Sequence, residues 1–292
     1  MSMIKKIAAG AAAFLLCALL FNAALAASAP LVYRVTDGEG HRLYLLGTIH
    51  VGRSDMFPLG GAVEEAYAES DILAVEMDVI RAGNLFNALR MSSAVAYADG
   101  DDVTNHLSPK TCELGFAVLG LPEQTLRMMK PAAWLSLAEN LGAEYGRLDT
   151  VHGVDYYLLV RARSDRKPVV ELEGLDVQMD FLNALSDEAL DEEIYAVLSD
   201  PEDYGMQMRA LLDAWLIGDE LALDYMVNSD AGDEFYEEII AGRNEAFLEQ
   251  AVEYLSGEET VLIAIGAGHI IGETGLARQL AALGYDVEEI GR

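Results

Sequence analysis

Two apolar segments at opposite ends of the chain each stop at a Gly-x-x-His sequence. Residues 42–46 lead into Gly47-Thr48-Ile49-His50, and residues 260–265 lead into Gly266-Ala267-Gly268-His269. Each segment has the length and composition of a buried strand, and each is followed by a helical stretch and a second strand. Strand, turn, helix and strand in this order are typical of a parallel β-sheet covered by helices.

The chain between these two units is predicted to be mostly helical, with one short strand at residues 168–172. We expect helices at about 85–94, 109–119, 123–129, 132–143, 155–164, 175–185, 186–198, 203–217, 219–227 and 233–255. No proline-rich or Gly/Ser-rich linker divides the chain. The sequence therefore predicts an α/β fold with a central mixed, largely parallel sheet, formed as a single domain over residues 27–292 with a helical insertion at about 82–165.

His50 and His269 both follow directly on a predicted strand. In open α/β sheets, ligands bind outside the carboxyl ends of the strands, and glycine beside each histidine lets a ligand approach the backbone closely. If both strands lie in one sheet, the two imidazoles converge on one cleft, where they could bind a metal or act as a base. A strand-end histidine that only satisfies nearby backbone groups is the alternative.

Two acids also close predicted strands. Glu76 ends the strand at 71–77, where it is a candidate metal ligand, a candidate general base, or an edge acid that faces water. Glu173 follows the strand at 168–172, and its alternation with Leu172 predicts that it points to the same side as Glu171. Asp155 begins a predicted helix, for which capping is the more common role.

Arg243 and Asn244 lie on the last long predicted helix. The neighbours of Arg243 three and four residues away are apolar, so the sequence shows no local ion pair, and this face of the helix is predicted to point inward. Either a guanidinium that binds an anion or a carbonyl group, or an arginine paired along its helix, fits this position.

Charge and the first segment of the chain bear on location and partners. The formal net charge is −30, which disfavours binding to nucleic acid or to anionic membrane surfaces. Residues 1–26 combine Lys5 and Lys6, an apolar run and a small-x-small site at Ala24-Leu25-Ala26, which is typical of a secretory signal. We therefore expect a periplasmic or secreted protein with no stable membrane span after cleavage, although a retained anchor is the alternative.

Several common catalytic motifs are absent from the sequence. There is no His-Glu-x-x-His zinc motif, no Gly-x-Ser-x-Gly nucleophile elbow and no complete dinucleotide fingerprint, because His269 interrupts the loop that begins at Gly266. The candidate chemistry therefore depends on the two Gly-x-x-His histidines and the acids near them.

With these residues identified, the chain resembles the TraB/GumN family, which includes the PrgY and TIKI proteins. The resemblance runs from about Val32 to Ile290. The matching pieces, in chain order, are residues 45–52, Val75-Glu76-Met77, Lys130-Pro131, Gly153-Val154-Asp155, Glu171-Leu172-Glu173 with Gln178, residues 214–219, Arg243-Asn244 and Gly266-Ala267-Gly268-His269. The resemblance implies a fold like that of the erythromycin esterase and ChaN proteins, a mixed sheet with helices.

For the TIKI members, the resemblance implies a divalent-metal-dependent protease with two histidines and a glutamate at the site. Those positions correspond to His50, His269 and Glu76, with manganese or cobalt favoured and zinc possible. The hydrolysed substrate would be a peptide or a small molecule. Glu76 or Glu173, whichever is not bound to metal, would act as the base, Arg243 would hold the oxyanion, and Asn244 would help to orient substrate.

The resemblance leaves two alternatives open. A non-enzymatic binder of haem or of a signalling peptide would use His50 or His269 as an axial or hydrogen-bonding ligand. A metal-free, esterase-like hydrolase would use His50 as a base.

Overall fold

A six-stranded mixed sheet forms the centre of the protein. The computed structural model describes residues 29–98, 100–228 and 234–291. The sheet has the order β4-β3-β5-β2-β1-β6. Its strands are β1 (Val32–Thr36), β2 (Arg42–Thr48), β3 (Ile72–Val75), β4 (Val169–Glu171), β5 (Val261–Gly266) and β6 (Asp286–Ile290). The predicted fold class, a mixed and largely parallel sheet with a helical middle region, is confirmed.

The strands from the two ends of the chain lie side by side in this sheet. β5 pairs in parallel with β2 on one side and with β3 on the other, and β3 pairs in parallel with β4. β1 pairs antiparallel with β2 and with β6. The sequence did not predict β1. Because β1 pairs with β2 and β6 pairs with β1, β6 lies at the edge of the sheet and not beside β5.

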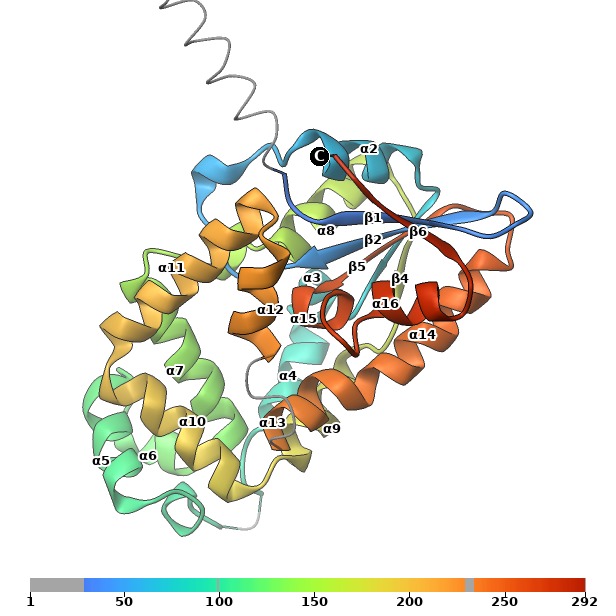
Figure 1. Ribbon diagram of the computed structural model, residues 1–292. Coiled ribbons are helices and arrows are strands. Elements are labelled where there is room, and N and C mark those ends of the chain that lie inside the picture. The colour runs from blue at the N-terminus through green and yellow to red at the C-terminus, as the bar shows by residue number, and fades with distance from the viewer. Residues whose placement is uncertain (1–28, 99, 229–233, 292) are drawn as a thin grey trace, which may run out of the picture.

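The central strands are apolar because both faces of the sheet are covered. The first five residues of β5 are buried, and so are all residues of β2 after Arg42. Figure 1 shows α2 (Gly61–Glu69) and α8 (Val154–Asp165) over one face, and α14 (Gly242–Leu255) and α16 (Leu276–Ala282) over the other. Because β2, β5, β3 and β4 pair in parallel, their carboxyl ends lie at one edge of the sheet.

Most of the other helices form a second layer beside that edge, from the centre to the lower left of Figure 1. They are α3 (Val79–Ala82), α4 (Leu85–Ala94), α5 (Pro109–Val118), α6 (Glu123–Arg127), α7 (Pro131–Tyr145), α9 (Leu175–Ala184), α10 (Asp187–Ser199), α11 (Pro201–Ile217), α12 (Glu220–Asn228) and α13 (Glu234–Tyr236). Trp134 anchors a separate apolar cluster among α5, α7 and α10. Part of the helical layer therefore has its own core, whereas α11 and α12 pack on the main core through Leu212, Trp215 and Leu223. The layer forms a wall in front of the strand ends.

Two local predictions need correction. The single helix expected at 233–255 is divided, because a π-helical turn, η4 (Glu237–Ala241), lies between α13 and α14. The two Gly-x-x-His sequences also differ in backbone. His50 follows β2 in a bend, whereas His269 lies within a short helical turn, α15 (Ala267–Ile270).

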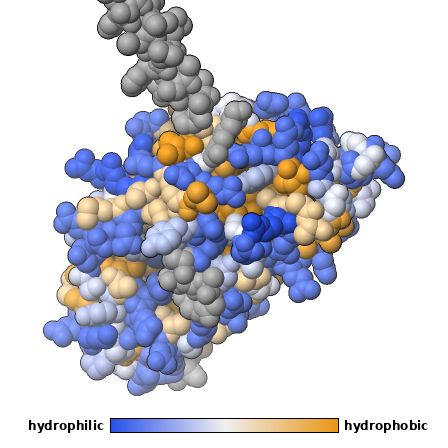
Figure 2. Space-filling view, viewed as in Figure 1, coloured by the Kyte–Doolittle hydropathy of each residue, from blue (hydrophilic) through white to orange (hydrophobic). Residues whose placement is uncertain are grey.

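The predicted signal segment, residues 1–26, lies outside the described residues. Within the described part of the chain, no helix combines the length and the apolar character needed to cross a bilayer. The face of the molecule shown in Figure 2 is largely hydrophilic, with apolar side chains in small groups. This agrees with the strongly acidic composition.

Candidate functional site

Three neighbouring parallel strands bring the predicted site residues together. His50 lies two residues beyond β2, Glu76 directly follows β3, and His269 lies three residues beyond the end of β5. Because β5 is between β2 and β3, the carboxyl ends of all three meet at one edge of the sheet. Residues separated by more than 200 positions, such as His50 and His269, thereby line one cavity.

Gly266 marks the point around which these side chains gather. A Cβ atom on this glycine would lie 3.2 Å from Glu76 Oε1, 3.5 Å from His269 Cδ2 and 3.8 Å from His50 Nε2. The backbone N–H of Gly266 also donates to Glu76 Oε1 over 2.6 Å. The missing side chain therefore leaves the space that the three functional groups share.

His50 is oriented by Asp155, from the first turn of α8. His50 Nδ1 and Asp155 Oδ2 are 2.8 Å apart, and the other carboxylate oxygen accepts a 2.7 Å hydrogen bond from Thr48. Gly153 permits this approach, since a Cβ there would lie 2.4 Å from the His50 carbonyl oxygen. With Nδ1 held by a carboxylate, Nε2 of His50 is left facing the cavity.

The negative charge of Asp155 raises the pKa of His50 to about 9. Burial of the imidazole opposes this shift, while the hydrogen bond to Asp155 and the charge of Glu76 add to it. The imidazole is nevertheless 68% exposed, because it lines the open cavity. In the absence of another cation, His50 is therefore protonated at pH 7.

His269 differs from His50 in that it is buried and its pKa is lowered. It is 2% exposed, its Nδ1 lies 2.7 Å from Asn244 Oδ1, and its ring packs edge-on against Phe247. Burial lowers the pKa of His269 to about 4, although Glu76 opposes that effect. His269 is therefore neutral at pH 7, and with Nδ1–H donated to Asn244 its Nε2 carries a free lone pair.

Glu76 is held as an anion. Its Oε1 lies 4.0 Å from His269 Nε2, and its Oε2 accepts hydrogen bonds from Arg243 Nη2 at 2.5 Å and Gln178 Nε2 at 3.1 Å. Burial raises the pKa of Glu76, but His269, Arg243, His50 and the Gly266 N–H outweigh it and lower the pKa to about 2. A buried carboxylate remains ionised here because a guanidinium faces it.

Arg243 is buried and ion-paired with two strand-end acids. It is 5% exposed, and its Nε and Nη2 donate to the two oxygens of Glu173 over 2.9 and 2.7 Å. Its Nη1 donates to the Ile239 carbonyl in the π-helical turn η4. The expectation that no acid lies three or four residues away on its helix is correct. The interpretation of an arginine paired along its own helix is wrong, because its partners Glu76 and Glu173 follow β3 and β4.

Glu173 and Asn244 do not line the cavity but hold side chains that do. Glu173 does not line the cavity, and Glu171 has different partners, the Arg81 side chain and the Asp78 N–H. Asn244 is buried between His269 and the Thr274 carbonyl, to which its amide donates over 2.7 Å. These two residues orient Arg243 and His269, respectively.

The shared cavity has a volume of about 490 Å³. His50, Glu76, Arg243 and His269 form its base, and the helices α7 and α11 form much of its outer wall. A second cavity of about 440 Å³, lined by Tyr156, Met77 and other residues, adjoins it. His50 and Glu76 line both cavities, so space for a ligand extends to either side of these two residues.

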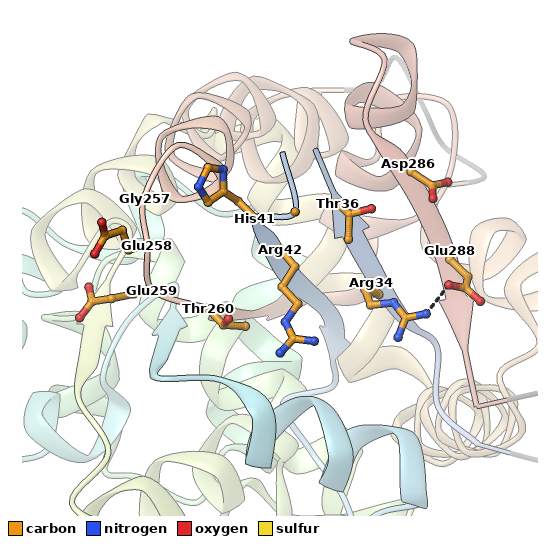
Figure 3. Close-up of a pocket in the computed structure, with 11 residues that line it drawn as sticks. Arg34, Thr36, His41, Arg42, Gly257, Glu258, Glu259, Thr260, Asp286 and Glu288 are labelled. Carbon is orange, nitrogen blue, oxygen red and sulfur yellow. Dashed lines mark hydrogen bonds and ion pairs between the residues drawn. The ribbon is translucent and has the colours of Figure 1, made fainter. Parts of the chain in front are cut away.

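A polar hollow at the opposite end of the strands is a separate feature (Figure 3). Arg42 begins β2, and Thr260 directly precedes β5, so this hollow lies at the amino ends of strands whose carboxyl ends carry the histidines. His41 at its rim belongs to a turn in which Asp37 Oδ1 accepts the N–H groups of Glu39, Gly40 and His41. The half-buried Asp37 carboxylate and His41 imidazole, which lie 2.7 Å apart, are therefore explained by the turn.

The prediction from sequence missed two site residues. Asp155 does not cap α8, whose cap position is Gly153, and it bonds His50 instead. Gln178 on α9 donates to Glu76 and, over 2.6 Å, to Glu173. Both residues are within the motifs that carry the family resemblance, which is the signal that could have identified them.

The pairing of His50 with Asp155 leads to a pH prediction. NMR titration of the metal-free protein should show His50 losing its proton near pH 9, and Asp155→Asn should move that pKa toward 6.5, because the charge of Asp155 is the main cause of the shift. Since the folded-state pKa is raised, this stabilisation is fully present below about pH 6.5 and lost as pH rises through 9. An unchanged His50 pKa in Asp155→Asn would contradict the assignment.

Comparison with known proteins finds relatives over most of the chain. No solved structure matches the chain, so the resemblance to the erythromycin esterase and ChaN folds stays a prediction. A protein named "Uncharacterized protein YbaP" from Escherichia coli K12 is 26% identical over 255 residues, which cover 86% of this chain and 92% of that protein. Its namesake from Shigella flexneri is 27% identical over the same lengths. The TraB/PrgY/gumN family model matches residues 31–289, and the chain belongs to that family.

Proposed function

We propose that this protein is an exported hydrolase that cleaves a peptide or related carbonyl substrate with the help of a divalent cation held by His50 and His269. One observation carries the proposal. Both imidazoles have Nδ1 tied to an oxygen acceptor, and both line one cavity beside an ionised glutamate and a buried arginine. The exported location rests on the signal-like residues 1–26.

The donor set suits a divalent cation. Metal-binding histidines usually donate their second ring N–H to a carboxylate or a carbonyl oxygen, as His50 does to Asp155 and His269 to Asn244. The glycine at 266 leaves room between the two rings and Glu76. Imidazole and carboxylate ligands suit manganese, cobalt and zinc, and the family resemblance favours manganese or cobalt. Such a cation would polarise a carbonyl group and acidify a bound water.

The cation would be held mainly by the two histidines. Among the described residues, three potential ligand atoms lie within 4.8 Å of one another only in the exposed turn of Asp37, Glu39 and His41. Glu76 does not complete such a group, and its oxygens already accept from Gly266 and Arg243. Glu76 therefore fits the role of a base that takes a proton from water better than that of a tight third ligand.

Arg243 supplies positive charge on the cavity wall. Its guanidinium is held rigid by Glu173 and the Ile239 carbonyl. A preorganised cation of this kind stabilises negative charge that develops on a carbonyl oxygen without having to reorganise. Arg243 also helps to keep Glu76 ionised at neutral pH, while lowering its affinity for a proton.

The protonation state of His50 disfavours metal-free catalysis with this histidine as the base. With its pKa raised to about 9, His50 carries a proton at pH 7 and cannot accept another. A bound cation would take the place of that proton at Nε2. The two adjoining cavities favour a substrate that extends to both sides of His50, as a peptide does.

Elemental analysis tests the proposal directly. After loading with manganese, cobalt or zinc and removal of free metal, wild-type protein should retain about one equivalent, and His50→Ala and His269→Ala should lose most of it. His106→Ala is the matched control, because His106 pairs with carboxylates as His50 pairs with Asp155 but does not line the shared cavity. Retention of no metal by the wild type, or equal retention by all variants, would refute the proposed cation site. A Soret band after addition of haem would instead favour the binding alternative.

A further inference from the structure

The wall of the shared cavity that faces the histidines carries an acid that the proposed chemistry does not use. Glu139 and Asn140 lie on α7, and Tyr204 lies on α11, and all three line the same cavity as His50. α7 and α11 pack closely here, since a Cβ on Gly142 would lie 2.2 Å from the Tyr204 ring. The three polar side chains are therefore held on one rigid wall.

Within the described residues, no Lys, Arg or His side chain forms an ion pair with Glu139, although the charge of His50 acts on it. No hydrogen bond or ion pair joins its carboxylate to any residue of the described ranges. Asn140 uses its amide N–H on the Ser136 carbonyl, which leaves its side-chain oxygen as an acceptor. This wall thus offers a carboxylate, an amide oxygen and a phenol oxygen, and an acceptor-rich surface of this kind suits a donor that carries positive charge.

The surroundings of these acceptors are apolar. Leu135, Met208, Leu211, Trp215 and Leu223 line the cavity between the helical wall and the strand ends. A ligand that fills this space must bring an apolar group together with its donor. The distribution of polar and apolar groups therefore selects for a molecule with a protonated amine next to an apolar side chain.

We propose that Glu139 is the centre of an ammonium-binding subsite, which selects substrates with a free amino group beside an apolar side chain. This proposal rests on the proposed hydrolase function, because it places the scissile carbonyl at His50 and the amine at the helical wall. A free amino terminus of a peptide has this chemistry. Acylation of the amine removes both its charge and two of its donors.

The electrostatics of the wall agree with this assignment. Burial, opposed by the charge of His50 and assisted by that of Glu193, raises the pKa of Glu139 to about 7. An ammonium group bound at the carboxylate would favour its ionised form. Binding of an amine should therefore release protons from Glu139 near neutral pH.

Calorimetry with two probes tests the subsite apart from catalysis. L-Leucinamide and N-acetyl-L-leucinamide share the side chain and the amide and differ in the ammonium group. Wild-type protein should bind leucinamide about tenfold or more tightly than the acetylated probe, and Glu139→Gln should remove that preference, as expected for loss of a charge-assisted hydrogen bond. Glu144→Gln, on the same helix but exposed, is the matched control and should behave as wild type.

The outcomes separate the subsite from the proposed reaction. His269→Ala should abolish hydrolysis but keep the preference for leucinamide, so a protein that hydrolyses nothing can still confirm the subsite. Equal binding of the two probes by wild-type protein, or no binding of either, overturns the proposal whether or not Glu139→Gln folds. A Glu139→Gln variant that loses activity equally on free and N-acetylated peptides also overturns it, because Glu139 would then act on the reaction and not on the amine.

Discussion

Arg243→Met is expected to lower the free energy of unfolding by about 3–5 kcal/mol, the cost of leaving a buried charge without its partner. The guanidinium is 5% exposed and is bonded to Glu76 and Glu173, whose side chains are 11% and 5% exposed. Methionine fills much of the same volume, so the loss of stability comes from two buried carboxylates without a partner and not from a large cavity. Chemical denaturation at pH 7 measures the change.

Companion variants show whether charge is the cause. Adding Glu173→Gln to Arg243→Met removes one of the two unpaired buried charges and should recover part of the lost stability. Arg209→Met, at an exposed position on α11, should change the free energy of unfolding by less than about 0.5 kcal/mol. A loss of less than about 1 kcal/mol in Arg243→Met would mean that the ion-pair network is not a stabilising unit.

His50→Ala and His269→Ala are each expected to reduce kcat/KM by about a thousandfold, the scale on which loss of activation of the attacking water slows hydrolysis. Each imidazole lines the same cavity, His50 from the bend after β2 and His269 from α15. Because the two rings would act on one cation, the double variant should be little worse than either single variant. Initial rates on a peptide library, measured with manganese, cobalt and zinc, supply the comparison.

The control for these variants is His41→Ala, which should keep wild-type rates because His41 lies at the amino ends of the strands. All variants should be compared at equal folded fraction, since His269 is buried against Phe247 and its removal also costs packing. Multiplicative losses in the double variant would show that the two histidines work independently. Wild-type rates in either single variant would contradict the proposed function.

Local pattern was sufficient to find every strand of the sheet except β1, and the residues that follow the strand ends. Buried-type runs before Gly47 and Gly266 predicted β2 and β5, and the following helix-strand pairs predicted a parallel sheet, so His50 and His269 could be placed at one edge. Glu76 was identified in the same way, from its position after β3. β1 was missed, and its pairing with both β2 and β6 depends on partners at opposite ends of the chain.

The electrostatic state of the site was decided by tertiary structure. Arg243 showed no partner on its own helix, yet it binds Glu173 and Glu76, which are 70 and 167 positions away. Asp155 had the position of a helix-start residue, and only the packing of α8 on the His50 turn makes it the partner of His50.

The sequence by itself determined which residues stand at strand ends, because strand, turn and helix formation depend on neighbours within a few positions. Only the tertiary structure decided which of those residues are charged and which face the cavity. The insertion of β5 between β2 and β3 sets the distances between His50, Glu76 and His269. A pKa depends on burial and on charges within a few ångströms, and those neighbours exist only after distant segments have packed together.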